Sequence, residues 1–220
     1  MHSIWFLIIN MIFIFSLYRV VDFYLSLSYE KFNEYDIKRK NYIIKNFIKS
    51  YILYYISVAT IPLVPMVLLN IGDVNKFLHF TGFLYCSNDT VALFKNMNMS
   101  YSTKIHHIIS TTLSTINIFV DSLRDNNITK LMSIYCLLSC YPYEVNYCLG
   151  MRFLLDRTKE KKMKKLAFIK YSCCCFINWS IHSIYLIYNI RNLNIVMVGY
   201  YSLIVFIVYD DIVLLKWLRN

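Results

Sequence analysis

Long apolar runs separated by short polar segments dominate this chain of 220 residues. Each run is close to the roughly 20 residues with which an α-helix crosses a bilayer. Seven runs follow one another, at about Ile4–Val21, Phe47–Ile71, Phe77–Phe94, His106–Leu123, Leu131–Leu155, Leu166–Ile190 and Ile195–Leu215. The pattern predicts an all-α protein, a polytopic membrane helix bundle of about seven transmembrane helices that forms a single domain over residues 1–220.

The polar segments carry a charge pattern that predicts an orientation. Lys and Arg are in excess after the first, third and fifth runs and at the C-terminus, but not after the second, fourth and sixth. Because cytosolic loops are enriched in Lys and Arg, we expect a lumenal or external N-terminus and a cytosolic C-terminus. The sequons at Asn98 and Asn127 are then cytosolic and lumenal, respectively. The first run follows Met1-His2-Ser3 without a basic residue or a small-residue cleavage site, so we interpret it as an uncleaved helix.

Composition agrees with a membrane protein and limits the partners. The chain is 58% hydrophobic and 16% charged, with a net charge of +10. Since the basic residues gather between apolar runs, topology signalling and contact with anionic headgroups explain the charge, and we expect no nucleic-acid partner. The seven cysteines show no CxxC or zinc-ligand spacing and lie mostly within apolar runs, so we expect no disulfide framework, no metal site and no bound cofactor. Palmitoylation of Cys173–Cys175 stays open as a minority alternative.

Ionisable residues interrupt four of the apolar runs near their predicted cytosolic ends. They are His106 and His107 in the fourth run, Asp89 in the third, Glu144 in the fifth, and Asp210 and Asp211 in the seventh. At a rise of about 1.5 Å per residue, all of them fall in the same half of the membrane. Ionisable groups at such depth are costly and mark functional sites. We therefore predict one polar site shared by four helices and open toward the cytosolic leaflet.

Structural roles remain open for each of these residues. Interfacial histidines are also typical of the headgroup boundary, which would explain the His106-His107 pair. Asp89 and Glu144 would serve only to hold helices together if they pair with a histidine or with Arg152. The aspartate pair at the end of the seventh run would lie at the surface if that helix is short.

Three short motifs, in order, give the chain a resemblance to a known family. They are Phe83-Leu84-Tyr85-Cys86-Ser87-Asn88-Asp89, then His106-His107 opening the next helix, and then Tyr141-Pro142-Tyr143-Glu144-Val145-Asn146 with Arg152 following. Together they resemble the TLC domain of ceramide synthases, translocating-chain-associated proteins and smaller lipid-regulating membrane proteins, with the best match over about residues 47–217. The Arg-Gly stretch and paired aspartates of ceramide synthases do not follow Leu113, and Asn146 stands where a serine is usual. The smaller proteins are therefore the closer match.

The resemblance implies two functions in lipid metabolism. The first is acyl transfer in the endoplasmic reticulum membrane, from acyl-CoA as co-substrate to a lipid amine. His106 or His107 would be the general base, Asp89 would fix its tautomer, and the substrate would be held by Glu144, Arg152 and Asp210. The second is a non-enzymatic lipid-binding protein that regulates membrane lipid composition or lipid trafficking, with a headgroup in the polar site.

Two further expectations concern the surroundings of that site. Membrane lipids are the expected partners, and the resemblance is compatible with a homo-oligomer. The basic segment Arg157–Lys165, predicted to be a loop, would attract the phosphates of CoA. Topology signalling alone also explains that segment.

Overall fold

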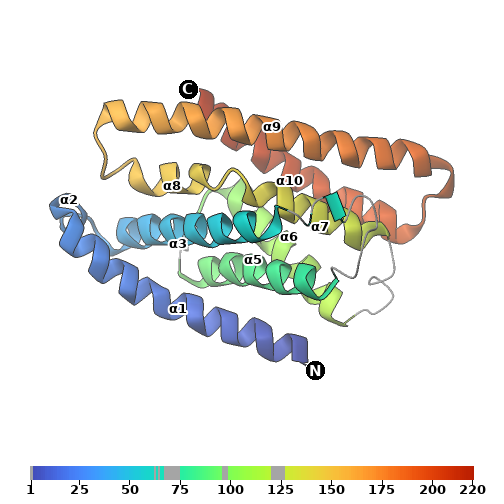
Figure 1. Ribbon diagram of the computed structural model, residues 1–220, viewed down its shortest axis with the longest axis horizontal. Helices are drawn as coiled ribbons and strands as arrows, with labels where there is room; N and C mark the ends of the chain where they lie inside the picture. The colour runs from blue at the N-terminus through green and yellow to red at the C-terminus, as the bar shows by residue number, and fades with distance from the viewer. Residues whose placement is uncertain (1, 62, 64, 67–74, 96–98, 120–126) are drawn as a thin grey trace.

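Helices make up all the regular structure that is described in the computed structural model, which covers residues 2–61, 63, 65–66, 75–95, 99–119 and 127–220 (Figure 1). They are α1 (His2–Ser28), α2 (Glu30–Asn33), α3 (Ile37–Thr60), α5 (Asn75–Lys95), α6 (Tyr101–Phe119), α7 (Asn127–Cys140), α8 (Glu144–Met151), α9 (Arg157–Asn189), the 3-10 turn η2 (Ile190–Asn192) and α10 (Ile195–Arg219). The all-α prediction is confirmed for these residues.

The long helices lie side by side along the longest axis of the molecule, and successive ones run in opposite directions (Figure 1). α3 packs mainly on α8 and α1, α5 packs on α6 and α1, and α10 packs on α6 and α9. α7 and α8 together make one pass through the bundle in the same direction (Figure 1). The helices that carry the predicted site residues are therefore neighbours.

The fifth apolar run forms two helices instead of one. α7 ends at Cys140, a turn follows over residues 141–143, and α8 begins at Glu144. Pro142 lies in that turn, where its missing N–H and its ring prevent an uninterrupted helix. The expectation of one helix over Leu131–Leu155 is corrected accordingly.

Two helices begin earlier than hydropathy predicts, because aspartates in polar segments cap them. Asp36 accepts a hydrogen bond from the backbone N–H of Arg39 at the start of α3. Asp156 accepts a hydrogen bond from the backbone N–H of Lys159 at the start of α9, with N and Oδ1 2.9 Å apart. This hydrogen bond lowers the pKa of Asp156. The basic segment Arg157–Lys165 is thus the beginning of α9, and its prediction as a loop was wrong. Lys, Arg and Glu are good helix formers, so the segment needs only this cap.

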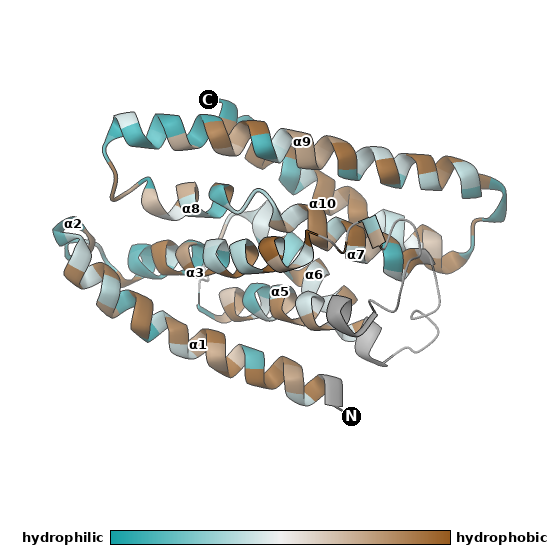
Figure 2. Ribbon diagram, in the orientation of Figure 1, coloured by the Kyte–Doolittle hydropathy of each residue, from teal (hydrophilic) through white to brown (hydrophobic). Residues whose placement is uncertain are grey.

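Hydropathy is distributed unevenly over the bundle. Polar residues gather at one end, on α2, the starts of α3 and α9, and the C-terminus, whereas apolar residues cover most of α1 and the far half of α9 (Figure 2). Within the described residues, Ile4–Ser28 and Ile195–Arg219 are long and apolar enough to cross a membrane. Large apolar side chains such as Ile9, Phe13 and Phe23 are exposed on α1. Seven spans stay a prediction.

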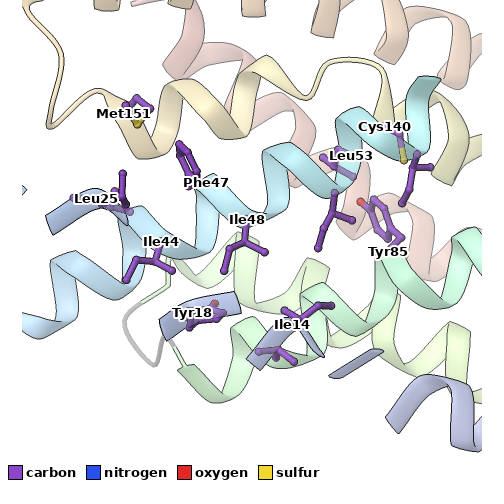
Figure 3. Close-up of a cluster of buried hydrophobic side chains, with 14 of the residues drawn as sticks. Ile14, Tyr18, Leu25, Ile44, Phe47, Ile48, Leu53, Tyr85, Cys140 and Met151 are labelled. Atoms are coloured by element: carbon purple, nitrogen blue, oxygen red, sulfur yellow. The ribbon is translucent and has the colours of Figure 1, made fainter. Parts of the chain in front are cut away.

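The main core joins α1, α3 and α5 to the end of α7 and to α8. Its buried side chains include Ile14, Tyr18, Leu25, Ile44, Phe47, Ile48, Leu53, Tyr85, Cys140 and Met151 (Figure 3). α8 approaches α3 closely at Gly150, where an added Cβ would lie 3.1 Å from the backbone oxygen of Ile43. This close approach fixes the distance between α3 and α8, which both line the site.

Some sequence predictions fall wholly or partly outside the described residues. They are the helix ends near Ile71 and Leu123 and the sequon residue Asn98. The kink that Pro62 predicts in the second apolar run, and the turns that polar residues predict at Asp73–Lys76 and Asp121–Lys130, also fall there.

Candidate functional site

A fully buried carboxylate, Asp89 of α5, joins three helices. Its Oδ1 lies 2.6 Å from Nζ of Lys49 on α3, and Ser110 of α6 donates a hydrogen bond to its Oδ2 at 3.1 Å. Nδ1 of His107, also on α6, lies 2.9 Å from Oδ1, although the contact is not aligned as a hydrogen bond. A buried charge is tolerated only with partners of this kind. Asp89 is 0% exposed and His107 2%, so solvent does not share in this contact.

The adjacent His106 contacts a different carboxylate. Successive residues of an α-helix point about 100° apart, so His106 faces α10 while His107 faces α5. Nδ1 of His106 lies 3.3 Å from Oδ2 of Asp210, again without hydrogen-bond alignment, and Thr103 donates to Oδ1 of Asp210 at 3.3 Å. The structure therefore forms two separate histidine–aspartate pairs, His106 with Asp210 and His107 with Asp89.

Both histidines line a cavity of about 410 Å³. Its walls come from α3, α6, α8 and α10, together with residues of α5, α7, α9 and the adjoining turns. Charged side chains on these walls are Lys45, Lys49, Arg152, Asp210 and Asp211. We call this space the polar cavity.

A second cavity of about 110 Å³ is lined mainly by apolar and small side chains of α5, α6, α7 and α10. Gly82, Leu113 and Met132 are among them. His106 and Tyr85 line both this apolar cavity and the polar cavity. His106 therefore places an imidazole, and Tyr85 a phenol, where the two spaces meet.

Asp211, next to Asp210, is held by side chains of other helices. Tyr135 of α7 and Tyr171 of α9 donate hydrogen bonds to its carboxylate, and Nε1 of Trp179 donates to Oδ2 at 3.4 Å. These three donors satisfy Asp211 without a cation. Its alternative placement in a surface loop is wrong, because it is buried inside α10.

The two remaining predicted residues are placed differently. Glu144 forms an ion pair with Lys170 of α9 and does not line the polar cavity. The alternative in which Glu144 pairs with a histidine or Arg152 is therefore wrong as to the partner, although the ion pair does join α8 to α9. Arg152 does line the cavity, and its guanidinium lies over the rings of Phe153 and Trp217 at 4.6 and 4.9 Å. The structure thus brings Arg152, Asp210 and the histidines to one cavity and leaves Glu144 outside.

Sequence reasoning missed two lysines of the site, Lys45 and Lys49. Lys45 falls in the polar segment before the second apolar run and Lys49 falls inside that run, yet both are buried on α3 and line the polar cavity. Their spacing of four residues is the signal that was available, since it places them on one face of a helix.

The described residues contain no group of three His, Cys, Asp or Glu side chains that converge as metal ligands. Comparisons of the chain with protein-family models, with curated proteins and with solved structures found no match.

Proposed function

We propose that this chain is a multi-span membrane protein of lipid metabolism that transfers an acyl group from acyl-CoA to a lipid amine. The observation that carries the proposal is the position of His106. It lines both cavities, and its Nδ1 lies 3.3 Å from Asp210. A general base must reach both the reacting groups and an orienting partner. The contact with Asp210 supports the second need, and the place of His106 between the two cavities supports the first.

The proposed chemistry uses few protein groups. The amine nitrogen attacks the thioester carbonyl carbon and forms a C–N bond, and Nε2 of His106 accepts the proton that the amine loses. Asp210 holds the ring through Nδ1. The tetrahedral adduct then collapses, the C–S bond breaks, and the thiolate takes the proton from His106, giving an amide and free CoA. A positioned base of this kind contributes about 10²- to 10⁴-fold in rate.

The two cavities divide the substrate between them in this proposal. The apolar cavity accepts the part of the acyl chain next to the thioester, because its lining is apolar or small. The polar cavity accepts the amine headgroup and the polar part of the donor. The thioester carbon then lies beside His106, where the cavities meet.

Several features support seven spans with a cytosolic C-terminus. α1, α3, α5, α6, the α7–α8 pass, α9 and α10 alternate in direction (Figure 1). The polar residues gather at the end of the bundle where α3 and α9 begin and α10 ends (Figure 2). Exposed apolar side chains on α1 and α10 fit contact with lipid. Location in the endoplasmic reticulum rests on the TLC resemblance alone.

One observation favours the second candidate, a lipid-binding protein without turnover. His107 is enclosed with Asp89 and Lys49 in a contact that joins three helices, so one histidine of the pair has a structural role. In that case the polar cavity would hold a lipid headgroup. Replacement of His106 would then change the affinity for lipid, and there would be no turnover to lose.

The test is acyl transfer by the purified full chain in lipid, with labelled acyl-CoA and a panel of lipid amines. We expect turnover with at least one amine, and a loss of about 10²-fold or more in His106→Gln and in the double variant His106→Ala/His107→Ala. Tyr188→Phe, at an exposed position, is the control. Absence of turnover with every acceptor, together with specific lipid binding, would establish the lipid-binding candidate instead.

A further inference from the structure

Two cations on the wall of the polar cavity have no carboxylate partner. Lys45 is 4% exposed, and none of the described carboxylates lies within ion-pair distance of it or of Arg152. Nε of Arg152 is buried without a hydrogen-bond partner. Both residues line the polar cavity.

The two cations share one aromatic neighbour. Nζ of Lys45 lies 5.4 Å from the ring centre of Tyr42, and Cζ of Arg152 lies 5.7 Å from the same centre. Asn46 and Asn146 line the cavity as well. One N–H of the Asn46 amide donates to the backbone oxygen of Tyr42, which leaves its second N–H and the Asn146 amide as donors. Helix α3 and the end of α8 thus bring two positive charges and two amides to one region.

The neighbouring charges are already occupied. Lys49 contacts Asp89, Asp210 contacts His106 and Thr103, and Asp211 accepts from Tyr135, Tyr171 and Trp179. No acidic group of the described residues is left to neutralise Lys45 and Arg152 at contact distance.

Leaving these cations unpaired is costly for the protein alone. The cost is larger for Lys45, which is buried, than for Arg152, which is half-buried with its Nε enclosed, because a buried charge without a partner is strongly unfavourable. Lys45 also precedes Lys49 by one helical turn on the same face, where like charges repel. The cation–π contact with Tyr42 offsets only part of the cost. An anionic ligand would supply the missing charge.

We propose that Lys45 and Arg152 form a subsite for a phosphate group. A guanidinium and an ammonium match the several acceptor oxygens of a phosphate, and the asparagine amides can complete its coordination. The phosphate is carried either by a soluble ester such as coenzyme A or by a lipid headgroup. The inference rests on the proposed function only in placing this molecule beside His106.

The first experiment measures binding of coenzyme A and of phosphatidic acid to the full chain in an uncharged detergent, by calorimetry and native mass spectrometry. Pantetheine and diacylglycerol, which lack phosphate, are the matched probes. We expect Lys45→Gln and Arg152→Gln each to weaken binding of the phosphate-bearing probe about tenfold or more. Lys161→Gln, at an exposed position of α9, removes the same charge and should change binding less than about twofold. If only coenzyme A or only phosphatidic acid binds, that result identifies whether the phosphate belongs to a soluble ester or to a lipid headgroup.

A second variant separates binding from folding. Lys45→Met removes the buried charge and keeps much of the side-chain volume, so we expect a higher melting temperature together with the loss of phosphate binding. A lower melting temperature would mean that the protein itself needs the charge, and would overturn the subsite. Unchanged binding in Lys45→Met, equal losses in Lys161→Gln, or no binding of either probe would overturn it too.

These results are distinguishable from failure of the proposed function. If phosphate binding depends on Lys45 but the unmodified chain transfers no acyl group, the subsite proposal is supported and the enzyme proposal is rejected. If acyl transfer depends on His106 but the Lys45→Gln variant binds coenzyme A with unchanged affinity, the enzyme proposal is supported and the subsite proposal is rejected.

Discussion

At the scale of single residues, the two adjacent histidines have separate surroundings. His107 is enclosed with Asp89, whereas His106 lies where two cavities meet. We expect His107→Ala to destabilise the fold by about 1–3 kcal/mol, because it leaves a buried carboxylate with one partner fewer. His106→Ala should change stability by less than about 1 kcal/mol and should abolish turnover or alter lipid binding. Thermal unfolding in detergent with both variants tests this, and equal destabilisation would show that the two histidines have the same structural role.

A glycine in the wall of the apolar cavity offers a second test. An added Cβ at Gly82 would meet no atom within 4 Å, and Gly82 lines that cavity. We expect Gly82→Leu to fill the cavity and to shift acyl-group selectivity toward shorter chains by about tenfold, through steric exclusion. The control is Gly199→Leu, since Gly199 also has open space but lies on α10 and lines neither cavity. Identical selectivity in the two variants would mean that the acyl chain lies elsewhere.

At the scale of helices, the contact between α3 and α8 depends on one small residue. A Cβ at Gly150 would lie 3.1 Å from the Ile43 oxygen and 3.3 Å from Cβ of Asn46. We expect Gly150→Ala to force the helices apart at a cost of about 1–3 kcal/mol. Gly199→Ala, in open space, should instead be neutral or stabilising by up to about 1 kcal/mol. Thermal unfolding compares them, and a Gly150→Ala protein as stable as Gly199→Ala would contradict the close approach.

The presence of each helix was predictable from the sequence wherever apolar residues are continuous. The first and last residues of the helices were less predictable. All seven runs contain helix in the residues that the structure describes, because each has apolar residues enough to cover a helical surface. The early starts of α3 and α9 depend on capping by Asp36 and Asp156, which a hydropathy window averages away. The break at Pro142 was visible in the sequence, but it was interpreted as a feature within one helix.

The grouping of the site residues was predictable in part, but their pairing was not. Helix rise predicts a common depth for the histidines, Asp89 and Asp210, and the structure brings these four side chains into two contacts. Which carboxylate faces which histidine depends on the rotation of each helix about its axis, and packing sets that rotation. Asp210 therefore faces His106. Glu144 instead pairs with Lys170 of α9, a helix that carries none of the predicted site residues. Their functional roles stay predictions.

At the scale of the whole molecule, the clustering of polar residues at one end makes the orientation testable. The segments at that end carry most of the Lys and Arg, and such segments are retained on the cytosolic side. We therefore expect an N-terminal extension that bears a glycosylation sequon to be modified when the chain is made with endoplasmic reticulum microsomes. The same extension at the C-terminus should stay unmodified.

The controls for this measurement come from the chain itself. Asn98 is predicted to be cytosolic and should remain unmodified, and an Asn→Gln change in the N-terminal extension should abolish the mass shift. Absence of modification at Asn127 decides nothing, because a sequon close to the membrane is a poor acceptor. Modification at Asn98 or at the C-terminal extension would reverse the orientation. The site, which is predicted to open toward the cytosolic leaflet, would then open toward the lumen, and the enzyme proposal would lose its donor.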